Sequence, residues 1–136
     1  MNVEEMADRL EIQDLNARYN RAIDTGDAEG WADAFTPDGV FHGIVVHCEG
    51  REELVAWVHE LWSNPSYAHF INGQHWIGNA VLELDDNEGK MWSNVIMVVP
   101  AADGARVSLL GVFTDELRRL DGRWLLARRT LTTTVA

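Results

Sequence analysis

Four long segments of strand-like composition follow one another in the second half of the chain, and this run constrains the fold more than any other feature. The segments cover about residues 68–84, 90–101, 105–120 and 123–135, with short turn signals rich in Asp, Asn and Gly between them. Consecutive strands joined by such short loops pair with their neighbours in an antiparallel meander. We therefore expect the C-terminal half to form one large antiparallel sheet.

The N-terminal half is typical of helices. Apolar residues recur at spacings of three and four over residues 3–23, as in an amphipathic helix. Gly26 can cap this helix, and Asp27 can begin a second short helix over residues 28–35.

A strong turn signal comes next, at residues 36–39, and a strand or tight hairpin is expected over residues 40–47. A third helix begins within residues 49–53 and ends before Pro65. The order of elements predicts a single α+β domain over residues 1–136, in which a strongly curved sheet wraps around three N-terminal helices.

Charge and composition exclude some classes of partner. The formal net charge is −11 and the sequence pI is about 4.7, so the surface repels nucleic-acid backbones and anionic membranes. No apolar run approaches membrane-spanning length, and the acidic N-terminus lacks the pattern of a signal peptide. We expect a cytoplasmic protein. Its one cysteine, Cys48, has no partner for an internal disulfide.

Two of the five histidines, His69 and His75, lie in the stretch over residues 68–79. Histidine exchanges protons near neutral pH, so one that projects from a strand into a pocket is a candidate general base. By residue type alone, a histidine beside Trp76 and Ile77 is more often a hydrogen-bonded packing residue than a base. His69 and His75 would share a face of a regular strand, which makes His69 a residue of the pocket mouth or a packing residue. Their spacing and the lack of a third ligand disfavour a metal site.

Three other polar residues could meet His75. Asp24 lies at the end of the first helix, where the helix dipole disfavours a carboxylate unless another group binds it. If Asp24 accepts a hydrogen bond from His75, the other ring nitrogen becomes a better base. Tyr19 could line the same cavity or belong to the core. Arg129 lies on the same strand face as Leu125 by alternation and needs a partner, which could be Asp24, Asp115 or an anionic ligand.

Several short motifs together resemble a known family. They are Ile12-Gln13-Asp14-Leu15-Asn16-Ala17-Arg18-Tyr19, Asp24-Thr25-Gly26-Asp27, Trp31-Ala32-Asp33-Ala34-Phe35-Thr36-Pro37-Asp38-Gly39-Val40-Phe41, His75-Trp76-Ile77-Gly78-Asn79 and Gly111-Val112-Phe113-Thr114-Asp115-Glu116-Leu117. The chain resembles the SnoaL-like branch of the nuclear transport factor 2-like superfamily. The resemblance implies a cone-shaped α+β barrel with a deep central pocket, and a homodimer formed through the outer face of the sheet.

The superfamily includes dehydratases, dehydrochlorinases, isomerases and polyketide cyclases beside non-catalytic members. By resemblance, His75 would be the base, Asp24 its orienting partner and Arg129 an electrostatic support. Dehydratase relatives carry a second acid-base residue one strand further on, but residues 96–100 of this chain contain none.

The leading hypothesis is a cofactor-independent lyase or isomerase that takes a proton from carbon in a small, largely apolar substrate, which could be cyclic. Tyr19 and Arg129 would stabilise the developing negative charge. Aromatic and apolar residues are candidates for the pocket wall; they are Trp31, Phe41, Trp57, Phe70, Trp76, Trp92 and Val98. The alternatives are a small-molecule-binding protein, a dimeric scaffold with a filled pocket, and a small subunit of a larger oxygenase.

Overall fold

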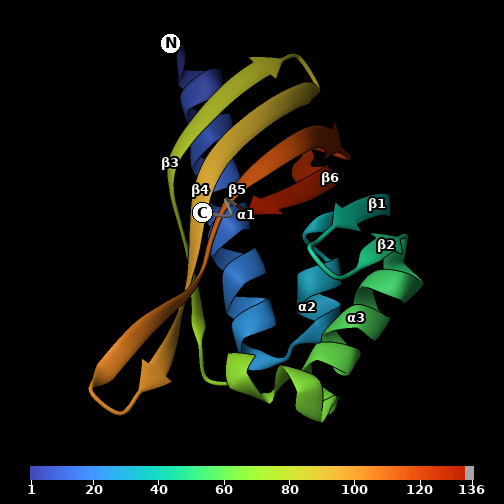
Figure 1. Cartoon of the computed structure of the whole chain (residues 1–136). Coiled ribbons are helices and arrows are strands. Elements are labelled where there is room, and N and C mark those ends of the chain that lie inside the picture. Colours follow the sequence, from blue (N-terminus) through green and yellow to red (C-terminus); the bar gives the residue numbers. More distant parts are fainter. Residues whose placement is uncertain (134–136) are drawn as a thin grey trace.

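Two helices precede a β-hairpin, and a third helix precedes the four-stranded meander, in the computed structural model, which describes residues 1–133. The long helix α1 (Val3–Thr25) lies against the inner face of the sheet, while α2 (Ala28–Ala32) and α3 (Arg51–Ser63) pack against each other (Figure 1). The expected order of helices and sheet is confirmed.

The sheet has six strands in the order β2-β1-β6-β5-β4-β3. Two form a hairpin, β1 (Phe35–His42) and β2 (His47–Glu49), and four form the meander, β3 (Gln74–Asp85), β4 (Glu88–Ala101), β5 (Gly104–Leu120) and β6 (Arg123–Thr133). The expectation of a wholly antiparallel sheet is wrong at one place, because β1 pairs with β6 in parallel. Strands far apart in sequence have no short loop to force antiparallel pairing.

A β-bulge in β6 changes which side chains face the core. Ala127 is an extra residue, because the ladder pairs Arg128 and Leu126 with consecutive residues of β5. Strict alternation placed Leu125 on the same face as Arg129. This prediction is wrong, since the bulge shifts the pattern by one residue and buries Leu126 together with Arg129.

The second helix is shorter than expected. It ends at Ala32 because the carbonyl of Ala34 accepts a hydrogen bond from the backbone N–H of Leu126, 2.9 Å away, and Phe35 already belongs to β1. Residues 36–39, which were predicted to form a turn, lie inside β1. At this point the register of the pairing between β1 and β6 shifts.

Residues 65–70 form a short 3₁₀ helix, η1 (Pro65–Phe70), where a strand was expected from residue 68. The side chain of Asn64 accepts a hydrogen bond from the N–H of Ser66, and the φ angle of Pro65 suits a helical turn. The strand β3 therefore begins at Gln74, and His69 does not share a strand with His75.

The C-terminal end of α1 is fixed by α3. Gly26 adopts a left-handed conformation with φ of 76°, and the indole of Trp62 donates a hydrogen bond to the carbonyl of Ile23 at 3.0 Å. A Cβ atom at Gly26 would come within 2.9 Å of Trp62. This packing sets the position of Asp24, which lies on the last turn of α1.

Aromatic side chains fill the centre of the cone. Tyr19, Trp31, Phe35, Phe41 and Phe113 are all buried, with ring centroids 5.1 to 6.1 Å apart in their contacting pairs. The resemblance implied a deep pocket at this place. Because these rings occupy the space, the cavity described below is instead a groove at the side of the cone.

Arg129 is completely buried and forms two hydrogen bonds of 2.8 Å with the carboxylate of Asp115. A third bond, of 2.7 Å, runs from Nη2 to the side-chain oxygen of Asn16 on α1. The guanidinium also lies over the rings of Tyr19 and Phe113. Burial opposes the charge on Arg129, but the charge and hydrogen bonds of Asp115 outweigh it and raise the pKa of the guanidinium.

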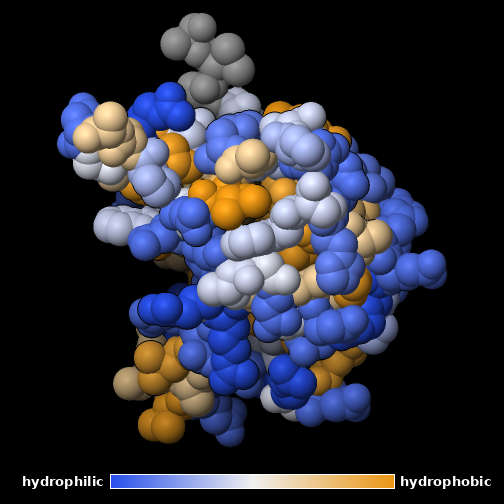
Figure 2. All heavy atoms as spheres, turned by 90° about the horizontal axis from the view of Figure 1, so that it is seen from below, coloured by the Kyte–Doolittle hydropathy of each residue, from blue (hydrophilic) through white to orange (hydrophobic). Residues whose placement is uncertain are grey.

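The face of the molecule seen in Figure 2 is mostly hydrophilic. From below, apolar residues lie at the centre and the lower left edge of the molecule, with hydrophilic residues around them (Figure 2). Within residues 1–133, no helix is long and apolar enough to cross a membrane.

We predict that Asp115→Ala lowers the free energy of unfolding by about 3–5 kcal/mol, because it leaves the charge of Arg129 buried without its partner. Denaturant titration followed by tryptophan fluorescence measures this change. The double variant Asp115→Ala, Arg129→Met should be more stable than Asp115→Ala, and equal stability of the two would contradict the ion-pair assignment.

We predict a loss of stability at high pH that depends on Tyr19. Burial raises the pKa of Tyr19 from 10.0 to about 12, so above pH 10 the phenol ionises in the unfolded chain while it stays neutral in the folded one. The contribution of the neutral phenol to the free energy of unfolding is complete below pH 10 and is lost as the pH rises to about 12. Its size is at most roughly 2–3 kcal/mol. Thermal unfolding in this range should show a steeper pH dependence in the wild type than in Tyr19→Phe.

Candidate active site

Asp24 and His75 form a hydrogen-bonded pair between the end of α1 and the start of β3. One carboxylate oxygen lies 2.6 Å from Nδ1 of the imidazole, and the other accepts the backbone N–H of His75 at 2.9 Å. Both side chains are mostly buried, with 15% and 18% of their surfaces exposed. The two hydrogen bonds offset the unfavourable interaction between the negative charge of Asp24 and the C-terminal end of the helix dipole.

The pairing sets the protonation pattern of the ring. A carboxylate only accepts hydrogen bonds, so Nδ1 of His75 carries the proton and Nε2 of the neutral ring keeps its lone pair. No residue within 1–133 forms a hydrogen bond with Nε2. The imidazole therefore has one nitrogen engaged by the protein and one available as an acceptor.

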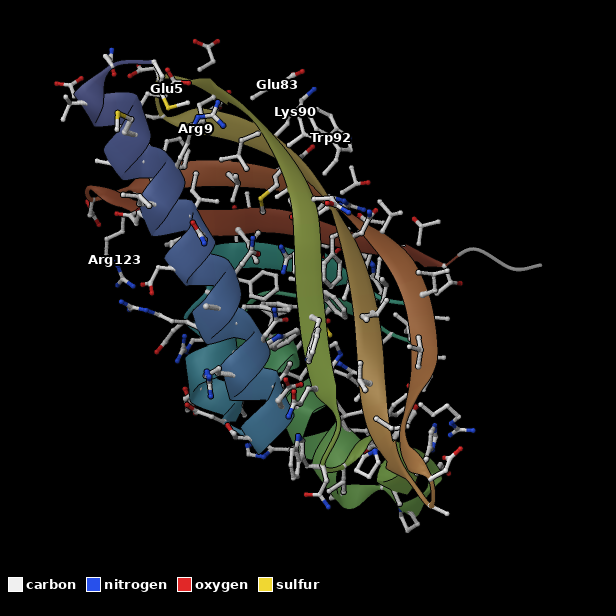
Figure 3. All side chains as sticks on the ribbon, turned by 90° about the vertical axis from the view of Figure 1, so that its left-hand side faces the viewer. Glu5, Arg9, Glu83, Lys90, Trp92 and Arg123 are labelled. Carbon is white, nitrogen blue, oxygen red and sulfur yellow. The ribbon has the colours of Figure 1, made fainter. Side chains whose placement is uncertain are left out.

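The pair borders a groove of about 890 Å³ between α1 and β3. Figure 3 looks onto this side of the molecule, with the helix on one side of the groove and the edge strand on the other. Arg9, labelled near the N-terminal end of α1, forms an ion pair of 3.1 Å with Glu5 and contacts the carbonyl of Leu82. These contacts join helix and strand at one end of the groove, and Asp24 and His75 lie toward the other.

About half of the groove lining is polar, which the sequence analysis did not predict. Besides Asp24 and His75, the polar lining residues are Arg9, Gln13, Asn16, Asn20, Arg21, Thr25, Asn72, Gln74 and Asn79. The available signal was the spacing of Asn16, Asn20 and Asp24, which recur every four residues on one face of α1. Two asparagines on the inner face of an amphipathic helix interrupt its apolar pattern.

Of the residues expected to form the pocket wall, only Trp76 borders the groove, and its pairing with Ile96 puts its side chain on the outer face of the sheet. Trp31 and Phe41 belong to the aromatic core. Trp92, labelled in Figure 3, and Val98 lie on the outer face of the sheet, because the inward positions of β4 are the odd-numbered ones from Met91 to Val99.

The remaining wall candidates lie around η1. The rings of Trp57 and Phe70 both pack against Tyr67, away from the groove. His69 is exposed beside Phe70 because η1 replaces the expected strand. The expectation that His69 and His75 lie at the same pocket is therefore wrong.

Tyr19 and Arg129 also lie outside the groove lining. They stack on each other in the core behind it, and Asn16 connects the two regions because it lines the groove and binds Arg129. Of the partners considered for Arg129, the structure shows Asp115. The sequence-based hypothesis that Tyr19 and Arg129 line the same cavity as His75 is not borne out.

Cys48 does not reach the groove. It is buried against the core, and burial raises the pKa of its thiol to about 11, so it is protonated at neutral pH. Among residues 1–133, no three or more His, Cys, Asp and Glu side chains gather in a way that could bind a metal ion.

Comparison with known proteins places these features in a family. The model of the SnoaL-like domain matches residues 4–130. An uncharacterised protein of Mycobacterium tuberculosis, Rv2910c, is 31% identical over 137 residues, which cover 95% of this chain and 87% of that protein.

Solved structures show the same architecture. A protein of unknown function from Mycobacterium tuberculosis, Rv3472, is 30% identical with a TM-score of 0.85, and the match covers 98% of this chain and 75% of that one. A protein from Catenulispora acidiphila, solved in complex with S-DNPA, is 29% identical with a TM-score of 0.79, and covers 93% and 92% of the two chains.

Two chains from Novosphingobium aromaticivorans show the fold alone. One is an NTF2-like protein with a cystatin-like fold, 20% identical with a TM-score of 0.85 over 96% of this chain and 84% of that one. The other has been proposed to be a scytalone dehydratase and is 19% identical with a TM-score of 0.81 over 99% and 89% of the two chains. The chain belongs to the SnoaL-like domain family, within the NTF2-like fold.

Proposed function

We propose that this protein is a cofactor-independent lyase or isomerase in which His75 takes a proton from a carbon atom of the substrate. The observation that carries the proposal is the 2.6 Å contact between Asp24 and Nδ1 of His75 at the edge of a groove. This arrangement is the carboxylate–histidine half of a catalytic triad without the nucleophile, and it leaves Nε2 to accept a proton.

The proposed reaction is an elimination or isomerisation next to a carbonyl group. Nε2 of His75 accepts the proton on the carbon beside the carbonyl, and the bonding electrons move into an enolate. In an elimination they then form a C=C bond, and the leaving group on the next carbon departs with its own bonding pair. Asp24 stabilises the imidazolium formed in the first step. His75 returns the proton to the leaving group, or to another carbon in an isomerisation.

The lining changes the kind of substrate that we propose. A volume of about 890 Å³ is within the range for small-molecule sites and would hold a ring-sized molecule. The amide and guanidinium groups along α1 favour a substrate with several polar substituents, in place of the largely apolar one expected from sequence. Tyr19 and Arg129 have no direct part in this version, because both lie outside the groove.

The test uses two simple probes. The wild type should accelerate the exchange of α-hydrogens of cyclohexanone in D₂O and the loss of water from β-hydroxycyclohexanone, both followed by proton NMR. His75→Gln should lower the rates by about 10²–10⁴-fold, the usual contribution of a general base. Asp24→Asn should cause a smaller loss, because the base is still present but its tautomer is no longer set.

The matched control is His69→Gln, which changes an exposed histidine outside the groove and should leave the rates unchanged. Equal rates for the wild type and His75→Gln would contradict the proposed function. Circular dichroism of each variant shows whether a loss of rate reflects unfolding.

A second candidate function is binding of a small molecule without chemistry. The specific observation in its favour is the related Catenulispora acidiphila protein, which was solved in complex with S-DNPA. Under this alternative the probes would bind to the groove without exchange or elimination, and His75→Gln would alter affinity alone.

We also propose that two copies of the chain associate through the outer face of the sheet, as the family resemblance implies. Trp76, Ile96 and Leu110 are paired across β3, β4 and β5, and Trp76 and Leu110 each expose 58% of their surface. Val81, Val107 and Val112 are further exposed apolar residues on β3 and β5. Such a row on one sheet face is typical of an interface between protein chains.

We predict that Leu110→Lys converts a dimer into a monomer, because it places a charge within the apolar row. Sedimentation equilibrium measures the mass of each species. The control is Leu10→Lys, the same change at an exposed position on α1, which should not alter the mass. A monomeric wild type at high concentration would contradict the proposed interface.

A further inference from the structure

Three polar residues follow one face of α1 at intervals of four, namely Asn16, Asn20 and Asp24, and all three line the groove. Residues spaced in this way lie one helical turn apart on the same face. Asn20 is therefore the neighbour of Asp24 along the groove, and a molecule that touches the imidazole of His75 can also reach the side chain of Asn20.

The first and third of these residues have protein partners. Asn16 accepts a hydrogen bond from Arg129 at 2.7 Å and donates to the sulfur of Met91 at 3.6 Å. Asp24 accepts both hydrogen bonds from His75. Their roles in the folded chain are to bind the guanidinium and to orient the imidazole.

Asn20 differs from both. The residue is buried, with 9% of its surface exposed, and its Oδ1 atom has no hydrogen-bond partner within residues 1–133. A buried amide oxygen without a partner costs about 1–3 kcal/mol, so native proteins usually supply one. Asn20 lines the groove, but its Oδ1 atom is itself buried, so a water molecule or a group on a ligand reaches Oδ1 from there once the side-chain amide rotates toward the groove.

Three other buried polar atoms lack a partner in the described part of the chain, on Trp31, Ser93 and Arg129. None of those residues lines the groove. Trp31 and Arg129 lie around the hydroxyl of Tyr19, which lowers the cost of their unpaired groups. Among these four residues, Asn20 alone meets the groove.

We propose that Asn20 is a specificity-determining residue that accepts a hydrogen bond from a hydroxyl or N–H group of the ligand. The substrate class is then a small cyclic carbonyl compound with a hydroxyl or N–H group that faces Asn20 when the reacting carbon meets His75. This assignment of the reacting carbon rests on the proposed function. The recognition of a donor by Asn20 does not depend on whether His75 reacts.

The first arm of the test compares stability. Asn20→Leu replaces an unpartnered buried amide by an apolar side chain of similar size, so its melting temperature should equal or exceed that of the wild type. Asn16→Leu is the matched control one turn earlier, and it should lower the melting temperature by several degrees because Arg129 loses a partner. A drop for Asn20→Leu as large as that for Asn16→Leu would show that Asn20 is structural and would overturn the proposal.

The second arm measures binding with two probes, cyclohexanone and γ-hydroxycyclohexanone, neither of which has a leaving group next to the α-carbon. Titrations are followed through the side-chain amide signals of asparagine in ¹H–¹⁵N NMR spectra. The wild type should bind the hydroxylated ketone about fivefold more tightly, as one additional hydrogen bond allows. Asn20→Leu should bind both ketones equally.

The two proposals fail in distinguishable ways. If the fivefold preference is present in both the wild type and His75→Gln while neither exchanges α-hydrogens, the lyase proposal is wrong and the role of Asn20 stands. If the wild type shows no preference between the two ketones up to their solubility limit, whether because both bind equally or because neither binds, the role of Asn20 is overturned. A preference that persists in Asn20→Leu overturns it as well.

Discussion

The charge of Arg129 must be compensated inside the protein, and the way this happens governs the rest of the structure. Asp115 on the neighbouring strand supplies the opposite charge, and Asn16 supplies one more hydrogen bond from α1. A buried guanidinium tolerates little displacement of its partners, because a lost contact leaves a charge without solvent. The ion pair therefore fixes the helix against the sheet as well as joining two strands.

The position of α1 decides the geometry of the candidate site. Asp24 lies two helical turns beyond Asn16, and Trp62 and Gly26 hold the end of the helix where the carboxylate emerges. β3 is the last strand of the sheet, so its edge faces α1 and its first inward side chain, His75, meets Asp24. The core ion pair and the capped helix end thus act together on one contact of 2.6 Å.

The aromatic core explains why the groove lies at the side of the cone. Five aromatic rings occupy the space that a central pocket would need, and their close contacts leave the opening between α1 and the edge strand. A site in this place is lined by the polar residues that a helix presents near its boundary with solvent. The chemistry offered to a ligand is therefore hydrogen bonding along α1, with an acceptor nitrogen at one end.

Much of this protein follows from its sequence. Periodicity and turn residues predict three helices, the four-stranded meander and a single α+β domain, because these signals are local and short loops force neighbouring strands to pair. The family resemblance adds Asp24 and His75 as residues that belong together. Local pattern cannot predict the parallel pairing of β1 with β6 or the bulge at Ala127, because both depend on contacts between distant segments.

The tertiary structure alone decided the rest of the site. Whether Arg129 pairs with Asp24 or Asp115 depends on strand register, and whether Trp92 faces inward depends on the residue at which alternation begins. The sequence also does not reveal which asparagines of α1 have a partner inside the protein. Asn16 binds an arginine, whereas Oδ1 of Asn20 lacks a partner, and the residue type is the same in both cases. Sequence determines which chemical groups are present, and packing determines which of them are left free to act.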